Sequence, residues 1–411
     1  MVITIRLNVF CLLFALVLLL CFPCHSETPE AEADEDRVEN DCEDEDCVMH
    51  EKLKYTKEHR WSHYLEEIES ALAKYEPCSQ ANCSCHKSVI EADLSLWVED
   101  GVRRDMLDQL KDRGTTYQII EHKLYREEKC MFPFRCKGVE HFILEIIDDL
   151  PNMEFILNTH DYPQTIRRLK PGPVFSFSKT GVHADVMYPA WSFWEGGPAI
   201  SLYPTGIGRW DLHRDTIAKE AAKWPWEKKK PLGFFRGSRT TGERDALVLH
   251  SRSHPDAVDA QYTKNQAWRS LKDTLGVEPA SEVKFEDHCH YKYLYNFRGV
   301  AASFRLKHLF LCKSLVFHVG EEWKEFFYPA LKPWVHYIPI ATDFGNAWEL
   351  LDFVKENDEV VRQIAERGHE FVWHHLRMED VTCYWKTLLL EYAKLLKFRT
   401  RRNPSFAEVK R

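Results

Sequence analysis

The 411-residue sequence lacks the marker patterns of several common function classes. It has neither the GxGxxG fingerprint of dinucleotide oxidoreductases nor the GxxxxGK[ST] loop of P-loop enzymes, which argues against both classes. Its clustered cysteines, Cys83-Ser-Cys85 and Cys130-x5-Cys136, lack the CxxC or Cys/His spacing of zinc sites, so no metal site is predicted. The formal net charge is -9 and there is no basic stripe, so nucleic acid is not an expected partner.

The chain begins with the pattern of a signal peptide. One positive charge in Met1–Arg6 precedes an apolar run to Phe22, and a small residue stands before a plausible cut after Ser26. The alternative is a signal anchor that stays in the membrane. Because the run is shorter than the roughly 20 apolar residues of a spanning helix, we expect cleavage of residues 1–26 and no stable membrane insertion.

The cysteines favour an oxidising compartment. The chain has 13, and the three in the apolar start (Cys11, Cys21 and Cys24) leave with the signal, so an even set of ten remains. Disulfides are the favoured interpretation of that set. Asn82-Cys83-Ser84 fits an N-glycosylation sequon at Asn82.

A leader rich in acidic residues follows the signal. The stretch Glu27–Asp46 carries much of the negative charge and has few apolar residues to bury, which is typical of a disordered segment. Its acidic pairs resemble metal ligands, but a disordered tail does not hold ligands in place. We therefore predict a disordered leader over residues 27–54.

The rest of the chain alternates strands with helices. Short apolar runs predict strands at Glu154–Asn158, Val174–Phe177, Leu232–Phe235, Tyr293–Phe297 and Leu315–Val319. Helical spacing predicts helices at Tyr64–Tyr75, Phe142–Leu150, Arg244–Ser251, Ala301–Cys312, Glu349–Asn357 and Val360–His375. Such alternation implies parallel sheets, and the length suggests two domains, so we expect a two-lobed α/β protein with a cleft between the lobes.

Two segments combine a strand end, small residues and arginines. Phe234–Asp245 holds Arg236, Arg239 and Arg244 beside a Gly-Ser turn, and Asn296–His308 holds Arg298 and Arg305 at a predicted helix start. Helix N-termini and arginine forks bind phosphates, so we predict that these segments hold the diphosphate of a sugar nucleotide. The alternative is a capped helix with solvated arginines.

Two further segments are candidates for acceptor chemistry. Asp161 follows directly on a predicted strand and could take a proton as a general base, although the residues alone do not favour it over Asp185 or Asp211. The segment Cys130–Cys136 would display Met, Phe, Pro and Phe in a small disulfide loop. That loop either binds a protein partner or packs on its own domain.

An aromatic stretch, Met187–Ala199, contains two tryptophans three residues apart, which are more often core than sugar platforms. We predict a binding role only for the Gly-Gly-Pro-Ala turn at its end and for the following Tyr203.

Taken together, these segments resemble the Rumi family of protein O-glucosyltransferases, which is related to the capsule-associated glycosyltransferases. The resemblance runs from about Tyr75 to Leu396. It rests on strings that include LYREEKCMFPFRC, DYPQ, PVFSFSKT, MYPAW, GGPA, FFRGSRT, AQYTKNQAW and NFRGVAASFRLKHLFLCKSLVFHVG. No single string is specific to the family, but the occurrence of so many of them in the same order is.

The resemblance implies a GT-B-like α/β fold: two Rossmann-like domains facing across a cleft. It implies an inverting, metal-independent enzyme that moves glucose from UDP-glucose to Ser in the C-x-S-x-[PA]-C motif of folded EGF repeats, as in Notch-like receptors, with xylose from UDP-xylose as a side activity. Its domains would be an acceptor-side domain at 55–205, completed by helices at about 360–396, a UDP-sugar-binding domain at 206–359, and a basic tail at 397–411.

The resemblance also implies roles for individual residues. The family's catalytic aspartate falls on Asp161. Donor contacts fall on Tyr203, Ser238, Arg244, Val300, Ala301, Ala302, Ser303, Phe304 and Arg305. EGF contacts fall on Met131, Phe132, Pro133, Phe134 and Arg135, and on Ala199, Ile200, Ser201, Leu202 and Pro204. Disulfides fall on Cys78–Cys85, Cys83–Cys383, Cys130–Cys136 and Cys289–Cys312, with Cys42 and Cys47 left over in the leader.

The resemblance leaves some choices open. Many relatives reside in the lumen of the endoplasmic reticulum through a Lys-Asp-Glu-Leu-like tail, whereas this chain ends Ala407-Glu408-Val409-Lys410-Arg411. We expect the same lumen. The alternatives in function are a transferase that prefers UDP-xylose or acts on polysaccharide, and a luminal EGF-binding chaperone without transferase activity.

Overall fold

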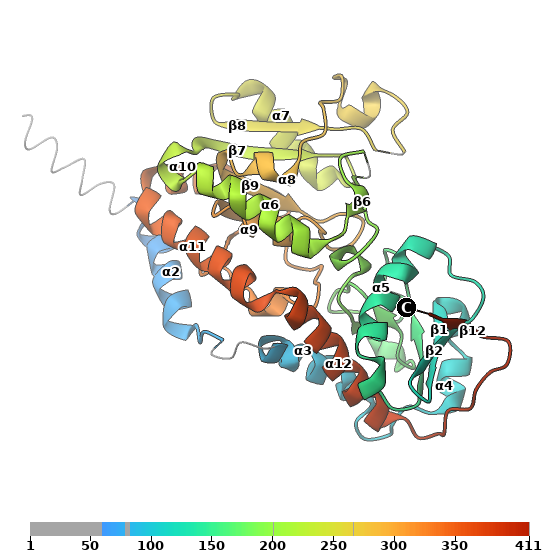
Figure 1. The fold of residues 1–411 in the computed structure, drawn as a ribbon. Coiled ribbons are helices and arrows are strands. Elements are labelled where there is room, and N and C mark those ends of the chain that lie inside the picture. The colour runs from blue at the N-terminus through green and yellow to red at the C-terminus, as the bar shows by residue number, and fades with distance from the viewer. Residues whose placement is uncertain (1–59, 79–82, 200, 266, 411) are drawn as a thin grey trace, which may run out of the picture. The chain divides into compact units, whose positions relative to one another are not determined.

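The computed structural model describes residues 60–78, 83–199, 201–265 and 267–410 (Figure 1). The predicted signal peptide and the whole of the leader, with Cys42 and Cys47, lie outside this range, as do Asn82 and Ile200. Arg60–Arg411 forms a single unit by its internal contacts. Within the described residues, no helix has the length and apolar character needed to cross a membrane.

The first sheet has six strands in the order β12-β2-β1-β3-β4-β5. Its strands are β1 (Thr115–Ile120), β2 (Lys123–Arg126), β3 (Met153–Leu157), β4 (Phe175–Ser176), β5 (Val186–Met187) and β12 (Ala407–Val409). The sheet is mixed, because β3, β4 and β5 run parallel while the other pairs are antiparallel. The strands β1 and β2 form an antiparallel hairpin with a two-residue loop. Its residues Glu121 and His122 both have positive φ, at 49° and 59°, as a type I′ turn requires.

The second sheet has five parallel strands in the order β11-β10-β9-β7-β8. Its strands are β7 (Lys230–Gly237), β8 (Val258–Tyr262), β9 (Tyr291–Phe297), β10 (Leu315–Val319) and β11 (Ile338–Ile340), and the short β6 (Pro204–Ile207) precedes them in the chain. In chain order this is the doubly wound topology 2-1-3-4-5, whose direction reverses between β7 and β9. Ligands of such sheets bind at the carboxyl ends of the strands beside that reversal.

Helices accompany both sheets. They are α2 (Ser62–Lys74), α3 (Lys87–Leu94), α4 (Arg104–Asp108), α5 (Pro133–Glu145), α6 (Trp210–Lys223), α7 (Asp245–Ser253), α8 (Phe285–His288), α9 (Leu306–Phe310), α10 (Ala347–Glu356), α11 (Asp358–His375) and α12 (Met378–Leu395). The α/β class is confirmed, with two separate sheets as the GT-B-like expectation requires. The domain boundaries remain a prediction.

Two predicted helices differ from the structure. The one expected over Phe142–Leu150 is the end of α5, which stops at Glu145, followed by a separate 3₁₀ turn at Ile147–Asp149, and the other is much shorter than expected. The helix expected over Ala301–Cys312 is α9, which begins only at Leu306. The preceding residues are a loop whose backbone is held by side chains: the Ser178 hydroxyl accepts from the Ala302 N–H at 3.2 Å, and the Tyr328 hydroxyl accepts from the Ser303 N–H at 3.2 Å. These bonds replace the helical ones, so the backbone does not turn into a helix until later.

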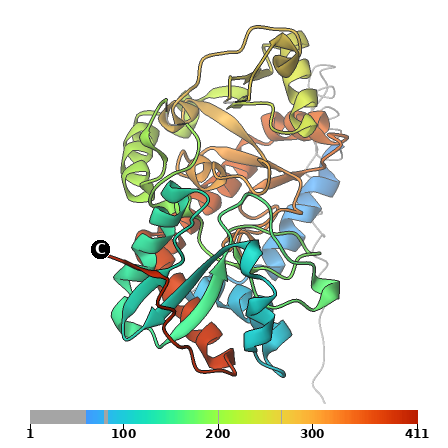
Figure 2. The same ribbon diagram turned by 90° about the vertical axis from the view of Figure 1, so that its right-hand side faces the viewer.

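The last segments of the chain return to the first sheet. Tyr384 on α12 donates to the Met187 carbonyl at 3.1 Å, and Tyr392 donates to the Glu154 carbonyl at 2.9 Å. The strand β12 then pairs with β2. In Figures 1 and 2 the red C-terminal elements lie beside the teal elements of the first sheet. The C-terminal segments are therefore part of the same hydrophobic layer as β1–β5.

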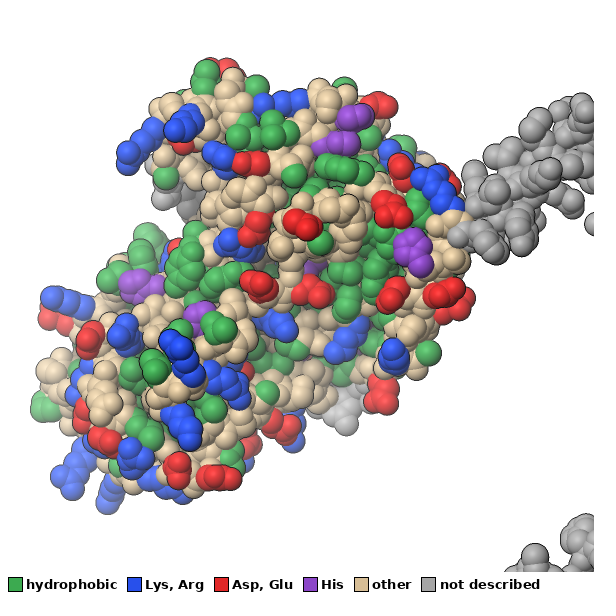
Figure 3. All heavy atoms as spheres, turned by 180° about the vertical axis from the view of Figure 1, so that it is seen from behind, with side chains coloured by type: hydrophobic (Ala, Val, Ile, Leu, Met, Phe, Trp, Pro, Cys, Tyr) green, Lys and Arg blue, Asp and Glu red, His purple; other side chains and the backbone are tan. Residues whose placement is uncertain are grey.

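All four disulfides implied by the resemblance are present: Cys78–Cys85, Cys83–Cys383, Cys130–Cys136 and Cys289–Cys312. Cys83–Cys383 joins the start of the described chain to α12 across 300 residues of sequence. On the face shown in Figure 3, acidic and basic side chains are interspersed. Such mixing is typical of a solvated surface.

Gly368 allows α11 to pack closely on its neighbours. A Cβ at this position would overlap the carbonyl oxygen of His336 and come within 2.8 Å of the Phe310 ring. We expect Gly368→Ala to lower the free energy of unfolding by about 1–3 kcal/mol, because overpacking outweighs the better helix propensity of alanine.

Gly181→Ala is the matched control, because a Cβ there meets nothing within 4 Å. It should change the free energy of unfolding by less than about 0.5 kcal/mol. Denaturant unfolding of both variants measures the difference, and a Gly368→Ala protein as stable as the wild type would contradict the close approach.

Candidate functional site

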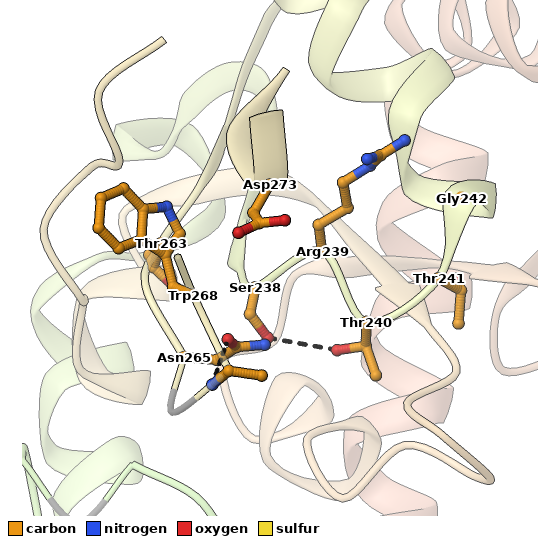
Figure 4. Close-up of a pocket in the computed structure, with 10 residues that line it drawn as sticks. Ser238, Arg239, Thr240, Thr241, Gly242, Thr263, Asn265, Trp268 and Asp273 are labelled. Atoms are coloured by element: carbon orange, nitrogen blue, oxygen red, sulfur yellow. Dashed lines mark hydrogen bonds between the residues drawn. The ribbon is translucent and has the colours of Figure 1, made fainter. Parts of the chain in front are cut away.

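A cavity of about 300 Å³ lies at the carboxyl ends of β7 and β8 (Figure 4). Its lining comes from the loop after β7 and the loop after β8: Ser238, Arg239, Thr240, Thr241, Gly242, Thr263, Asn265, Ala267, Trp268 and Asp273. The hydroxyls of Ser238 and Thr240 lie 3.2 Å apart and form a hydrogen bond. The loop that the sequence singled out for its arginines and hydroxyls therefore forms one wall of a polar cavity.

The five arginines of the two predicted anion-binding segments fall into two groups. Three are paired with carboxylates: Arg236 with Asp259 at 2.7 Å, Arg239 with Asp245 at 2.6 Å, and Arg298 with Glu243 at 2.7 Å. The other two, Arg244 and Arg305, have no carboxylate partner in the described part of the chain. The structure thus separates the arginines that are already neutralised from those that are not.

Arg244 is buried in the loop after β7. It donates to the Ser238 carbonyl at 2.5 Å, to the Thr240 hydroxyl at 3.0 Å and to the Arg298 carbonyl, while its Nε has no partner among the described residues. Burial, together with the charge of Arg305, lowers the pKa of Arg244 to about 9. The side chain is still charged at pH 7, and an anion nearby would offset the cost of burying it.

Arg305 approaches the same region from the loop after β9. Its Nη1 donates to the Arg236 carbonyl at 2.7 Å, and burial lowers its pKa to about 10. A Cβ at Gly237 would come within 2.6 Å of this guanidinium, so the glycine at the end of β7 leaves the space it occupies. The topological reversal of the sheet therefore brings together two positive charges that lack acids.

The remaining predicted donor residues lie in three settings. Val300 is exposed, and Ala301, Ala302 and Ser303 are buried. Phe304 stacks on Phe177, with ring centroids 5.0 Å apart. The amides of Ala302 and Ser303 are bonded to hydroxyls, so they are not the open helix-start donors that the sequence predicted.

Tyr203 contacts the start of α8 through its hydroxyl. Its hydroxyl accepts from the Phe285 N–H at 2.8 Å and donates to Glu286 at 3.1 Å. Burial raises the pKa of the phenol. The Tyr203 hydroxyl thus bonds to other residues of the protein. Ser201, which belongs to the predicted acceptor-facing stretch, bonds to Glu282 shortly before α8.

Asp161 lies in a turn immediately after β3. The amide side chain of Asn158 builds this turn by donating to the Tyr162 carbonyl at 2.8 Å and accepting from the His160 N–H at 2.8 Å. The Asp161 side chain is 37% exposed, and its Oδ1 lies 3.1 Å from Nη1 of Arg135. Its Oδ2 has no hydrogen-bond partner in the described part of the chain, so this oxygen can accept a proton.

The two other candidate carboxylates have different surroundings. Asp185 is fully buried and accepts four hydrogen bonds, from the Gln164 N–H at 2.7 Å, the Thr165 N–H at 2.8 Å and hydroxyl at 2.5 Å, and the Ser176 hydroxyl at 2.6 Å. Asp211 forms a two-pronged pair with Arg209, at 3.0 and 2.7 Å. Asp211 is about as exposed as Asp161, at 35%, but both of its oxygens are bonded to Arg209. Asp161 is therefore the one of the three that is both exposed and has an oxygen without a hydrogen-bond partner in the described part of the chain.

The predicted EGF-contacting loop is exposed. Met131 is 64% exposed and Phe134 69%, and the Cys130–Cys136 disulfide closes the loop around them. Phe132 contacts His160 and Arg135 contacts Trp191, so the loop is packed on its own domain in part. A protein partner for the exposed Met131 and Phe134 stays a prediction. Arg135 connects this loop to Asp161, which places the apolar loop next to the predicted base.

The tryptophans of the aromatic stretch serve as core, as their spacing favoured. Trp191 is fully buried against Phe177 and Phe304, and Trp194 stacks on His141 at 3.5 Å. Ala199 has a positive φ of 64° at the following turn. No contact places Ala199, Ser201, Leu202 or Pro204 beside Asp161 in the described part of the chain, so their acceptor role stays a prediction.

Among the described residues, one group has the geometry of metal ligands: Cys78, Cys85 and His375. The two cysteines are joined in a disulfide, so they offer no thiolate to an ion.

Comparison with known proteins places the chain in a family. Residues 78–411 match the family described as glycosyl transferase family 90. The chain is 58% identical to protein O-glucosyltransferase 1 of Homo sapiens over 354 residues, which cover 85% of this chain and 90% of that protein. It is 56% identical to O-glucosyltransferase rumi of Drosophila melanogaster over 345 residues, which cover 82% and 84%.

The chain belongs to glycosyl transferase family 90. Within it, this protein is a member of the group of protein O-glucosyltransferase 1 and the Rumi O-glucosyltransferases, as the resemblance indicated. Among solved structures, it is similar to Anabaena Alr3699/HepE in complex with UDP-glucose at 10% identity and a TM-score of 0.30, covering 44% of this chain and 52% of that one. A score at this level supports no conclusion about ligand or mechanism.

In this family 90 member, sequence reasoning missed part of the cavity wall. Thr263, Asn265 and Trp268 line the cavity, and Trp268 has a buried Nε1 without a partner among the described residues. They lie in the string AQYTKNQAW, just after β8. A polar loop that follows a predicted strand could have indicated these residues, since the loops after parallel strands gather at the same edge of the sheet.

The different surroundings of Asp185 and Asp161 lead to a stability test. Asp185→Asn replaces an oxygen by an amide donor that faces hydrogen-bond donors, so we expect a loss of about 2–4 kcal/mol in the free energy of unfolding. Asp161→Asn breaks one partly exposed ion pair and should cost less than about 1 kcal/mol. Denaturant unfolding compares the two, and equal losses would mean that the two carboxylates do not differ in role.

Proposed function

We propose that this protein is an inverting glycosyltransferase that moves glucose from UDP-glucose to a serine in the C-x-S-x-[PA]-C motif of folded EGF repeats, as in Notch. The observation that carries the proposal is the accessible Asp161 beside the exposed loop Met131–Phe134. The names of the relatives, protein O-glucosyltransferase 1 and rumi, support the glucosyl transfer.

On the acceptor side, Asp161 is the general base. Its free Oδ2 would take the proton from the serine hydroxyl as that oxygen attacks the anomeric carbon of glucose. A base on the acceptor face and a leaving group on the opposite face produce inversion in one displacement. The apolar side chains of Met131, Phe132 and Phe134 would hold the EGF repeat, whose folded surface supplies apolar contacts.

On the donor side, Arg244 and Arg305 receive the diphosphate. The bond from the anomeric carbon to the UDP oxygen breaks, and negative charge collects on the leaving diphosphate. Arg244 and Arg305 are held in place by hydrogen bonds and have no carboxylate partner among the described residues, so they stabilise that charge. Because these residues would supply the positive charge, we propose that the reaction needs no metal ion.

The family 90 identity and four disulfides support an oxidising luminal compartment, which we propose is the endoplasmic reticulum. Folded EGF repeats are disulfide-rich domains of the same pathway. Enzyme and acceptor would therefore meet where both are oxidised and folded.

The proposed reaction is tested by mass spectrometry. Purified protein, UDP-glucose and a folded EGF repeat should give a repeat heavier by one hexose, and Asp161→Asn should lower the rate by at least about 100-fold because the base is lost. The rate should be unchanged in EDTA.

The outcomes separate the alternatives. A pentose gain with UDP-xylose in place of the hexose gain would indicate the UDP-xylose transferase. Binding of the repeat without any mass gain would indicate the chaperone. Full activity of Asp161→Asn would rule out the base assignment.

The donor site has its own test. Arg305→Gln removes one of the two unpaired cations, so we expect the dissociation constant for UDP to rise about 10- to 100-fold by titration calorimetry, since a charged hydrogen bond contributes roughly 1.5–3 kcal/mol.

Arg362→Gln is the control, because Arg362 is exposed on α11 and pairs with Glu366 and Glu227. It should leave UDP binding within about twofold. If Arg305→Gln also binds UDP with wild-type affinity, the diphosphate does not lie at Arg305.

A further inference from the structure

Arg135 belongs to the exposed acceptor loop, but its charged group is turned toward Asp161. Nη1 of Arg135 lies 3.1 Å from Oδ1 of Asp161 and donates to the Thr159 carbonyl at 2.7 Å. It therefore contacts both the predicted base and the backbone two residues before it. Met131 and Phe134, from the same loop, are instead exposed.

The position of the Arg135 guanidinium is itself restrained by two aromatic rings. Arg135 lies over the ring of Phe132 at 4.3 Å and over the ring of Trp191 at 4.5 Å. Trp191 is fully buried, so it provides a fixed surface. Cation–π contacts with two aromatic rings restrict the orientation of the planar group that faces Asp161.

The backbone of Arg135 is equally well fixed. The residue lies in the first turn of α5, and its N–H donates to the Phe132 carbonyl at 2.9 Å. The next residue, Cys136, closes the loop by its disulfide to Cys130. A side chain mounted on a helix and a disulfide is precise enough to hold a neighbouring carboxylate in one rotamer.

We propose that Arg135 is a positioning residue: by holding Oδ1 of Asp161, it directs Oδ2 toward the acceptor serine. This inference rests on the proposed function. In the step it serves, the serine oxygen forms the bond to the anomeric carbon and its proton passes to Oδ2. The bond from that carbon to UDP breaks, and UDP leaves with the electron pair. Arg135 keeps its own protons throughout.

The proposal links substrate binding to catalysis. Met131, Phe132 and Phe134 would contact the EGF repeat, and Arg135 follows them within one disulfide-closed loop. A displacement of this loop would also move the group that orients the base. A misplacement of about 1 Å in a catalytic group can cost roughly 100-fold in rate.

The alternative role for Arg135 is a direct contact with the EGF repeat, and the two roles affect different kinetic constants. If Arg135 positions Asp161, Arg135→Met lowers kcat of glucosyl transfer about 10- to 100-fold and changes the KM for the repeat less than about threefold. If it only binds the repeat, KM rises and kcat stays, which would overturn the proposal.

Arg135→Lys provides a second, gentler variant. Lysine keeps the charge but cannot reach both the Thr159 carbonyl and Oδ1 with one planar group, so kcat should recover only partly. This variant keeps the test decisive if Arg135→Met does not fold, which circular dichroism would reveal. A lysine variant with kcat and KM equal to those of the wild type would also overturn the proposal.

A double variant tests whether Arg135 acts through Asp161. In Asp161→Asn, the added Arg135→Met should cause no further loss of kcat, because the group it orients is already gone. Losses that multiply would show an independent role and would overturn the proposal.

Arg126→Met is the matched control. Arg126 pairs with Glu140 at 2.8 Å in the same half of the chain, and its side chain is 24% exposed against 22% for Arg135. Its kcat and KM should stay within about twofold of the wild type. The wild-type reaction reports on the proposed function: no hexose gain there would overturn that function and this inference together, while an active wild type with the wrong variant pattern would overturn this inference alone.

Discussion

A buried carboxylate holds together the part of the molecule that presents Asp161. The strands β4 and β5 have only two residues each, so few ladder hydrogen bonds secure this edge of the first sheet. Asp185 compensates by accepting bonds from the loop after β3 and from Ser176 on β4. Asp93 on α3 does the same for β5, accepting from the Met187 N–H at 2.7 Å and from Lys179 at 2.5 Å. Buried carboxylates with several donors are costly to form but define one geometry, because each donor would otherwise be unsatisfied.

The segment just after β4 connects this edge to the loop that carries Arg305. Phe177 stacks on Phe304, the Ser178 hydroxyl accepts from the Ala302 amide, and Lys179 pairs by its backbone with Lys324. Phe177, Ser178 and Lys179 therefore support the loop that carries Arg305. The turn with Asp161 is held by the residue just before them, because Asn158 donates to the Ser176 hydroxyl at 2.9 Å. Neighbouring residues of one segment thus support both the turn and the loop.

Much of the fold could be predicted from the sequence because buried parallel strands leave a local signal. The apolar runs at β3, β9 and β10 were found nearly residue for residue, and the glycine and arginines at the end of β7 indicated a loop that lines a cavity. The hairpin of β1 and β2 and the strand β12 were missed, and the return of C-terminal helices to the first domain was expected only through the resemblance to the family. These depend on pairing between distant segments, which hydrophobic periodicity does not report.

The sequence by itself determined the class of the fold, the segments that carry chemistry and the family, since all three are written in local strings and their order. The residue patterns did not distinguish Asp161 from Asp185 and Asp211, or separate the five arginines of the two loops, and only the resemblance to the family singled out Asp161, Arg244 and Arg305. Only the tertiary structure shows which partners each charged side chain has. Asp185 accepts four hydrogen bonds and Arg236 pairs with Asp259, whereas among the described residues Oδ2 of Asp161 has no hydrogen-bond partner and Arg244 has no carboxylate partner. Burial and pairing are set by packing across the whole chain, which no local pattern contains.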